Sequence, residues 1–595
     1  LLIRYRYNYK DRVQAGVLAD KDAGEPLFRH KQQSGFDFYS YHLFIRRAGI
    51  VYSLAIGDFT VNMGQGLIQW QSLSFRKGSE LTTSKRQASV LRPYTSSGEF
   101  NFHRGAGISL RKKRCMLTGF VSFRKLSANL SSDSSDSVFI SSFLISGLNR
   151  TEAEQAERNN VRQTTAGINV SYDFSKGHTG VNIIHYQFSH PFKKRDELLN
   201  LYSWQGDRLT NLSLDYDHTW RNLHLFGEIA ISRHSRPENS AIDKSGIPGA
   251  IGYPAILQGL LISLDRKLGA GLVFRHLPSG FQSLNARAFT ENTSPTNETG
   301  LYFGLSCKPA KSFSVDGYAD VFRFPWLKFT TDAPSHGKEY MIQFTFRPNR
   351  RFELMGRCRI ESKESNVSGT DEHWGEFSRY ALDPRRAQPN LDQGQQYLHS
   401  PTNQCGPNNY QGPNPSSLNQ TQPSLCNSRL TIQPFYRPEM CTKINWRYHL
   451  TWQLTPEIRL RKRIELVQFD RKGPRPESGF LMYYDLNYQP KQHPYGIGGR
   501  LQFFETDGFN SRIYAFENDV PSSYSIPAAY QKGWRYYFNF QLTLKSAHSN
   551  RNRRLLPPVN IAVKVAQTIP QSQAGIEFRP ISPPDFKIQL LFFEY

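Results

Sequence analysis

The stretch KINWRYHLTWQL, from Lys443 to Leu454, decides the fold, because apolar and polar side chains alternate along it. Such a period of two is typical of a β-strand, whose successive side chains point to opposite faces. An alternation of about ten residues matches a tilted strand that crosses a membrane, whereas the strands of soluble sandwiches usually have about five or six. The stretch therefore predicts a transmembrane β-strand. One face carries Ile444, Trp446, Tyr448, Leu450, Trp452 and Leu454.

The segments that follow repeat this pattern after short breaks. Ile458, Leu460, Ile464 and Leu466 alternate with arginines and Glu465, and Phe480, Met482, Tyr484, Leu486 and Tyr488 alternate mainly with polar residues. A soluble sandwich leaves such polar faces in open solvent, and the lumen of a barrel accepts them equally well. The length of the segments and their aromatic side chains favour the barrel.

Short turns and long polar stretches alternate along the whole chain. Short turns and long loops at opposite ends are typical of bacterial outer-membrane barrels, with the short turns in the periplasm. The short turns are 46–49, 111–114, 175–178, 220–222, 308–311, 348–351 and 454–456. The long stretches are 64–98, 127–161, 189–210, 278–298, 322–337, 364–439 and 506–533, of which 364–439 is rich in Asn, Gln and Pro.

The fold class predicted from this alternation is all-β, a single large antiparallel transmembrane barrel spanning residues 1–595. About 23 strands can be traced, and single-chain bacterial barrels usually have an even number. We therefore expect about 24 strands (between 22 and 26), with at least one strand upstream of Leu1. The amphipathic segment Phe586–Phe592 and the terminal Tyr595 resemble the C-terminal signal of outer-membrane barrels.

Composition agrees with this class and leaves the partners open. Apolar residues make up 38% and aromatic residues 13% of the chain, and the mean hydropathy is −0.56, as expected when only alternate residues face lipid. The formal net charge of +24 fits a basic lumen and contacts with outer-membrane lipid and lipopolysaccharide. Nucleic acid also attracts such a charge, but no nucleic-acid motif supports it.

The sequence contains no motif that requires catalysis, a metal or a cofactor. There is no G-x-S-x-G, H-E-x-x-H or P-loop, and the six Cys form no CxxC pair. Asp215, Asp217 and His218 lie on one expected strand, with His218 on the opposite face. We therefore expect a protein that is not an enzyme. Cys405 and Cys426 bracket a polar stretch and are candidates for a disulfide.

The long stretch 63–98 is predicted to fold into the lumen. A barrel of this size would otherwise be an open channel, and Leu67, Ile68, Trp70, Leu73 and Phe75 are apolar anchors unsuited to water. We expect its basic residues to pair with acidic lumen residues such as Asp215 and Asp316. These basic residues are Arg76, Lys77, Lys85, Arg86 and Arg92.

Arg459, Arg461 and Arg463 share the polar face of one strand and form a basic ladder on the predicted inner wall. The ladder could attract anions or a polyanionic chain. The alternative, which we favour, is a structural network with Glu465, Glu353 and Asp485.

Several segments resemble a family of outer-membrane barrels from Bacteroidetes-type Gram-negative bacteria, whose members often carry a helix-hairpin-helix module ahead of the barrel. The resemblance implies a surface-exposed barrel without catalytic residues, and the module itself is absent from these 595 residues. The segments are KDAGEPLF (21–28), GFDFYSYHLFIR (35–46), GDFTVNMGQGLIQW (57–70), LRPYTSSGEFNFHRGA (91–106), GYADVFRFPWLKFTTDAPS (317–335) and RIYAFENDVPSSYSIPAAY (512–530).

Three classes of function remain open at this point. The first is a transport or secretion conduit of the outer membrane, plugged by its own loops or by a partner. The second is a non-conducting structural subunit that assembles with other outer-membrane or periplasmic proteins. The third, a barrel enzyme built from residues on different strands, has the least support.

Overall fold

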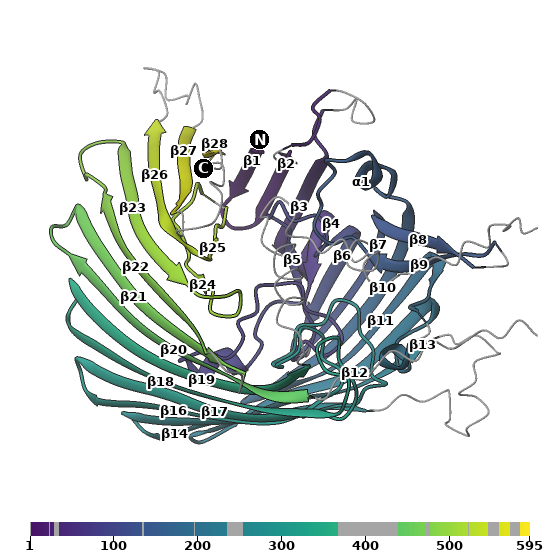
Figure 1. Cartoon of the computed structure of the whole chain (residues 1–595). Coiled ribbons are helices and arrows are strands. Elements are labelled where there is room, and N and C mark those ends of the chain that lie inside the picture. The colour runs from purple at the N-terminus through teal and green to yellow at the C-terminus, as the bar shows by residue number, and fades with distance from the viewer. Residues whose placement is uncertain are drawn as a thin grey trace, which may run out of the picture.

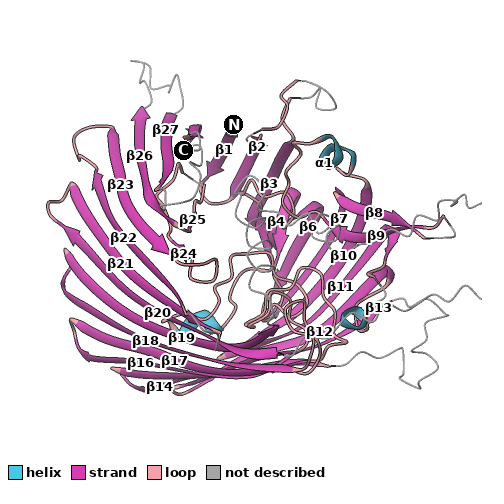
Figure 2. Cartoon of the chain, in the orientation of Figure 1, coloured by secondary structure: helices cyan, strands magenta, loops and turns pink. Residues whose placement is uncertain are grey.

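The computed structural model describes residues 2–22, 24–28, 35–133, 136–195, 197–234, 254–366, 438–471, 476–521, 523–544, 559–571 and 584–594. Nearly all regular structure is β-strand (Figure 2). The described helices are α1 (Glu152–Ala156), η1 (Leu81–Ser84) and η2 (Leu198–Asn200), and none is long and apolar enough to span a bilayer.

In the described part of the chain, twenty-three strands form the wall. Figure 1 shows that the wall closes into a ring. In chain order they are β1 (Leu2–Tyr9), β2 (Val13–Asp20), β3 (Phe38–Ala48), β4 (Val51–Val61), β6 (His103–Lys112), β7 (Cys115–Leu126), β10 (Val161–Phe174), β11 (Gly177–Phe192), β12 (Gly206–Trp220), β13 (Leu223–His234), β14 (Ala255–Asp265), β15 (Leu268–Leu277), β16 (Glu298–Ala310), β17 (Phe313–Phe324), β18 (Ser335–Asn349), β19 (Phe352–Asn366), β20 (Pro438–Gln453), β21 (Ile458–Asp470), β22 (Glu477–Tyr488), β23 (Tyr495–Thr506), β26 (Lys532–Leu544), β27 (Val559–Pro570) and β28 (Asp585–Glu594).

The remaining strands are short and lie beside the wall or within its loops. They are β5 (Leu91–Pro93), β8 (Ala128–Ser132), β9 (Val138–Phe143), β24 (Ile513–Tyr514) and β25 (Ala528–Ala529).

The predicted antiparallel barrel is confirmed, with one difference at its seam. Consecutive wall strands pair antiparallel, but β28 and β1 pair parallel, from Leu2 opposite Gln589 to Tyr7 opposite Glu594. An odd number of strands on a closed wall requires one such parallel pair, because directions can alternate around a ring only when the number is even. The expected additional strand stays a prediction.

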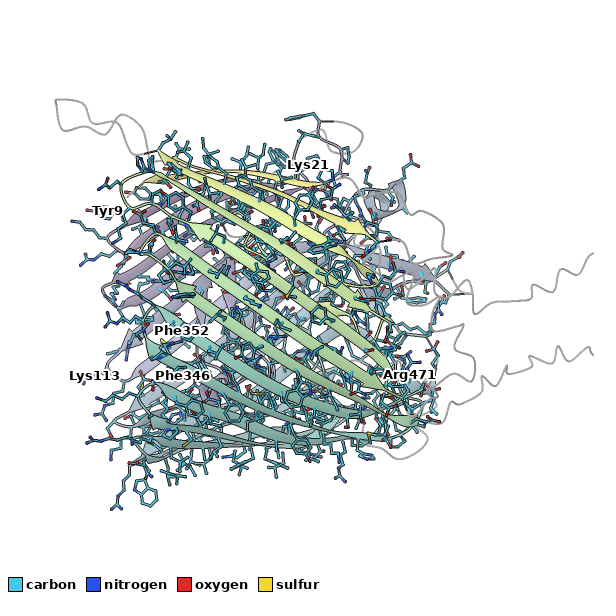
Figure 3. All side chains as sticks on the ribbon, turned by 60° about the vertical axis from the view of Figure 1, so that its left-hand side comes forward. Tyr9, Lys21, Lys113, Phe346, Phe352 and Arg471 are labelled. Atoms are coloured by element: carbon cyan, nitrogen blue, oxygen red, sulfur yellow. The ribbon has the colours of Figure 1, made fainter. Side chains whose placement is uncertain are left out.

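The two ends of the wall differ as the sequence predicts. Tyr9, Lys113 and Phe352 lie at the end with short turns, and Lys21 and Arg471 lie at the opposite end (Figure 3). The strand bounds refine the stretch 364–439, because residues 364–366 belong to β19 and 438–439 to β20. Residues 367–437, including Cys405 and Cys426, lie outside the described residues.

The wall reverses the burial pattern of a soluble protein. On β10, Ile168 and Val170 face outward and are half exposed, whereas the inward-facing Gln163, Thr165 and Asn169 are buried. Apolar side chains on an outer surface of this extent require a nonpolar solvent, and closure satisfies the strand hydrogen bonds without an open edge. The chain is therefore an integral membrane protein that spans the bilayer with its strands.

This assignment of faces can be tested at Ile464, which lies at the centre of β21 opposite the outward-facing Tyr448 and Met482. We expect Ile464→Arg to destabilise the barrel by about 2 to 4 kcal/mol, because the guanidinium would face the bilayer midplane. Urea titration of the protein refolded in lipid vesicles measures the change, with Ile464→Leu as the control. Equal stability of the two variants would show that Ile464 does not face lipid.

Candidate functional site: the lumen-filling segments

The chain between β4 and β6 folds back along the inner face of the wall instead of leaving the barrel (Figure 1). It begins with a tight turn in which Gly66 N–H donates to the carbonyl of Met63 at 3.1 Å, and Met63 N–H donates to that of Gln69 at 3.0 Å. Gly64 and Gly66 have φ angles of 53° and 82°, a region that favours glycine. We call residues 62–102 the lumen segment.

This turn binds a carboxylate of the wall. The backbone N–H groups of Gln65 and Leu67 donate to one carboxylate oxygen of Glu228 on β13, at 2.7 and 2.9 Å. A Cβ atom at Gly64 would lie 2.6 Å from the Glu228 carboxyl carbon, so the contact also requires a glycine there. Successive N–H groups in such a turn form a concave anion site. Here the acceptor is a carboxyl oxygen of the barrel wall itself, which fixes the turn to the wall.

The loop between β15 and β16 packs against the lumen segment and holds it from the other side. Trp70 N–H donates to the carbonyl of Asn285 at 2.7 Å, and Arg287 N–H donates to that of Gly66 at 3.0 Å. The Arg86 guanidinium donates to the carbonyl oxygens of Arg287, Ala288 and Phe75 at 2.8 to 3.1 Å. Burial lowers the pKa of Arg86 to about 10, so it stays charged at neutral pH.

Lys77 of the lumen segment pairs with three carboxylates around it. Its ammonium lies 2.6 Å from Glu291, 2.6 Å from Asp320 and 3.1 Å from Glu339, and only 6% of its side chain is exposed. Burial alone would lower the pKa of Lys77, but the carboxylates outweigh it and hold the pKa above its usual range.

The carboxylates around Lys77 have further cationic partners on the wall. Arg275 binds both oxygens of Asp320, at 2.8 and 2.9 Å, and also pairs with Glu298. Arg359 lies 2.8 Å from Glu339. Buried charges of opposite sign therefore alternate across this part of the lumen, and each has a partner.

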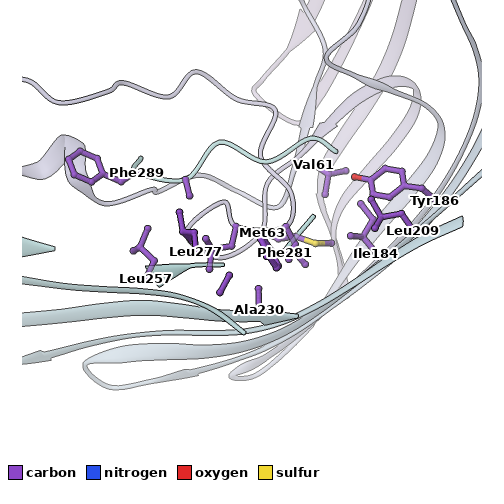
Figure 4. Packing of buried hydrophobic residues seen from close by; sticks show 14 of the residues in the cluster. Val61, Met63, Ile184, Tyr186, Leu209, Ala230, Leu257, Leu277, Phe281 and Phe289 are labelled. Atoms are coloured by element: carbon purple, nitrogen blue, oxygen red, sulfur yellow. The ribbon is translucent and has the colours of Figure 1, made fainter. Parts of the chain in front are cut away.

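An apolar core joins the lumen segment to the wall (Figure 4). Met63, Leu67 and Ile68 are buried, and their cluster includes Tyr186 and Leu257 on the wall. Tyr186 also donates from its hydroxyl to Gln69 at 2.6 Å. The lumen therefore contains a packed interior as well as an ionic one.

The sequence identified most, but not all, of the residues that carry these contacts. Lys77 and Lys85 pair with carboxylates, but Lys85 reaches Asp217 at 2.8 Å instead of the expected Asp215. Arg76 and Arg92 have neutral hydroxyl partners, Thr293 at 3.2 Å and Ser72 at 3.4 Å. Asp316 is bound by Ser306 and Ser314, not by the lumen segment.

The prediction that five apolar residues anchor the segment was wrong for two of them. Leu73 and Phe75 are 74% and 60% exposed, whereas Leu67, Ile68 and Trp70 are buried. Sequence reasoning also missed Glu228, because a carboxylate on a strand has no local feature that identifies the turn it binds. The available signal was the pair Gly64 and Gly66, because closely spaced glycines permit turns whose successive N–H groups converge on one acceptor.

A second segment, the described residues 507–521 and 523–531, also folds onto the inner wall, although the sequence indicated only a long loop there. Glu517 pairs with Arg535 on β26 and with Lys564 on β27, the latter at 3.0 Å. Ile513, Ala515 and Ala529 form an apolar cluster with Leu481 and Phe504 of the wall.

The basic ladder lies beside this second segment. Arg461 lies 3.1 Å from Asp485 and 2.8 Å from the Asn518 side chain, and Arg463 pairs with Glu465. Arg459 is exposed, and its guanidinium donates to Gln453 at 2.9 Å. Glu353, the other expected partner, pairs with Arg347 instead.

The remaining titratable side chains provide no recognisable catalytic or metal centre in the described part of the chain. His178 bridges Asp215 and Asp217 at 2.9 and 3.0 Å, while His218 lies on the other face beside Phe174. The described residues contain no group of three or more His, Cys, Asp or Glu side chains placed to hold a metal ion. Cys115, Cys307, Cys358 and Cys441 are free thiols.

The closed wall, apolar exterior and polar interior define the class of protein, an integral β-barrel of the outer membrane. No protein family model and no curated protein sequence matches the chain. Among solved structures, the ferripyoverdine receptor of the Pseudomonas aeruginosa outer membrane, bound to ferripyoverdine, is similar over 93% of this chain and 65% of its own, at 10% identity and a TM-score of 0.35.

OmpT, an outer-membrane protein of Vibrio cholerae, is similar over 72% of this chain and 97% of its own, at 8% identity and a TM-score of 0.28. The chain thus spans just under two thirds of the length of the Pseudomonas receptor. At these values the similarities carry no argument about function.

The ionic contact at Lys77 makes a testable prediction about the lumen segment. We expect Lys77→Met to leave Glu291, Asp320 and Glu339 short of positive charge, a loss of about 3 to 5 kcal/mol for a buried pair. Amide hydrogen exchange in residues 62–71 should then accelerate at least about 100-fold. Arg76→Met, which removes only an exposed contact, is the control. Unchanged exchange in the Lys77 variant would show that this contact does not hold the segment.

Proposed function

We propose that the protein is a conduit of the outer membrane whose lumen is closed by its own lumen segment. The observation that carries this proposal is the width of the wall. About eight strands already make a barrel that its own side chains fill, and this wall has 23. A protein that needed only an anchor could use a narrow barrel. A wide wall filled by separate chain segments is better suited to a passage that opens.

The chemistry of the contacts supports a closure that can be reversed. Lys77, Lys85 and the turn at Gly64 attach to wall carboxylates, and such contacts can exchange for water or for a ligand when the segment moves. Residues 62–102 contain no cysteine, so no disulfide ties the lumen segment to the wall. Outer-membrane lipid, lipopolysaccharide and other envelope proteins are the partners we propose.

The alternative is a non-conducting structural subunit, and one observation favours it. The lumen segment shares a continuous apolar core with the wall, and withdrawing Leu67, Ile68 and Met63 from that core exposes apolar surface to water. If the segment never leaves, the barrel serves as a rigid support for other envelope proteins.

Removal of residues 71–90 separates these functions. Both ends of this stretch lie beside Asn62, whose side chain accepts from Gln71 N–H and donates to the carbonyl of Ser89, each at 3.2 Å, so Trp70 can be joined to Leu91. In planar bilayers we expect the intact protein to conduct little or no current and the deletion variant to form a large, stable pore. Leu73→Ser, an exposed change in the same segment, is the control and should behave like the intact protein.

A second deletion covers the possibility that residues 507–531 also close the lumen. If the 71–90 deletion alone conducts no current, residues 508–529 are removed as well. An insulating bilayer with both deletions, in barrels that still show heat-modifiable migration in electrophoresis, would contradict the conduit and favour the structural subunit.

A further inference from the structure

The inner wall carries positive charge without matching carboxylates between the two lumen-filling segments. On β19, β20 and β21 the inward-facing side chains include Arg357, Arg447, His449, Arg459, Arg461 and Arg463, which we call the basic wall strip. On one side of the strip, Glu339 pairs with both Lys77 and Arg359. On the other side, Asn518 and Tyr514 of the second segment accept hydrogen bonds from Arg461 and Arg463.

Like charges face each other directly within the strip. Arg357 and Arg447 are register partners on neighbouring strands. Like charges at such positions destabilise a sheet, because their Cβ atoms are only about 5 Å apart. Around Lys77, by contrast, cations and carboxylates alternate.

The carboxylates near the strip are too few for its arginines. Glu465 receives both Arg447, at 3.0 Å, and Arg463. Asp485 receives both Arg461, at 3.1 Å, and Arg500. Glu353, another inward carboxylate on β19, is already paired with Arg347.

Arg357 and Arg459 have only neutral side-chain partners among the described residues. The Arg357 guanidinium donates to Gln343 at 2.8 Å and that of Arg459 to Gln453 at 2.9 Å. The buried Nε2 atom of His449 has no hydrogen-bond partner in the described part of the chain. These groups can accept an anion without breaking an existing ion pair.

The spacing and composition of the strip indicate the kind of anion. Inward positions on one strand recur about every 7 Å, so Arg459, which is exposed, and Arg461, which is partly exposed, fit successive charges of an extended chain. A single-stranded nucleic acid would need aromatic side chains on which its bases stack. No Phe, Tyr or Trp stands at the inward positions of these three strands between the strip residues.

We infer that the basic wall strip binds a chain of repeated anionic groups without bases, of the kind found in acidic polysaccharides and polyphosphate. This inference deepens the proposed conduit, because it rests on the lumen being a passage and assigns the charge of what enters it. The lumen segment would then close the passage beside the strip and not over it, since its ionic contacts end at Glu339 on β18.

Binding can be measured on the full chain in detergent, where no conductance is required. Fluorescence anisotropy with labelled inorganic polyphosphate should show saturable binding that weakens as salt rises, since bound counterions are released. A sulfated oligosaccharide should compete, because it offers the same repeated charge. The double variant Arg357→Gln/Arg459→Gln should bind at least about tenfold more weakly, and it leaves no carboxylate without its partner.

The matched control removes the same charge elsewhere. Arg221 and Arg350 are exposed on short turns at the end of the wall, and Arg221→Gln/Arg350→Gln should bind polyphosphate like the unchanged chain. The inference would be overturned if the strip variant bound polyphosphate as well as the unchanged chain does. It would also be overturned if both double variants bound equally weakly, or if the unchanged chain bound no polyphosphate. Tighter binding of an oligothymidylate than of polyphosphate would overturn the choice of a base-free chain. Binding to the strip together with insulating deletion variants would contradict only the conduit.

Discussion

A closed wall of 23 strands encloses more room than its own inward side chains can fill, and the rest of the structure responds to this constraint. Closure itself is imposed by the bilayer, because hydrocarbon offers no hydrogen bonds to an open sheet edge. The outer face must then be apolar and the inner face can be polar. Residues 62–102, 507–521 and 523–531 turn inward from the long-loop end and contact the inner face of the wall.

The lumen segment is held by a combination of nondirectional and directional contacts. Leu67, Ile68 and Met63 bury apolar surface in the core. This burial stabilises the segment, but because it is nondirectional it does not fix the position of the segment along the wall. The turn around Glu228 and the three carboxylates at Lys77 fix the position of the segment along the wall, because each of these acceptors binds one particular donor of the segment. Water or a ligand can replace these polar contacts, which the apolar contacts do not allow.

The sequence was sufficient to predict the strands of the wall, because the alternation of apolar and polar residues is local and recurs in each strand. The alternation in 443–454 recurs along the chain, and the turns at 220–222 and 348–351 follow directly from breaks in it. An inward position of 63–98 was predicted from its apolar residues, but the sequence could not show which of them are buried. Leu67 and Leu73 are equally apolar in the sequence, and only the fold places one in the core and the other at the surface.

The sequence predicted that basic residues of the lumen segment pair with carboxylates of the wall, but it did not predict which carboxylates. A lysine in the lumen segment was expected to meet a carboxylate of the wall, and Lys77 and Lys85 do. The particular partners depend on strand register and on the path of a loop across many strands, which no local pattern encodes. The second inward segment was missed for a related reason, because residues 506–533 show the polarity of an ordinary loop until Glu517 is placed beside Arg535.

The central claim is that the lumen segment is packed against the wall in the folded barrel, and cysteine accessibility tests it most directly. In a chain whose six cysteines are replaced by serine, Leu67→Cys and Leu73→Cys place one thiol in the core and one at the surface of the same segment. The account predicts rapid modification of the thiol at 73 by a water-soluble maleimide and protection at 67 until the protein is unfolded. Equal, rapid modification at both positions in the folded barrel would contradict it.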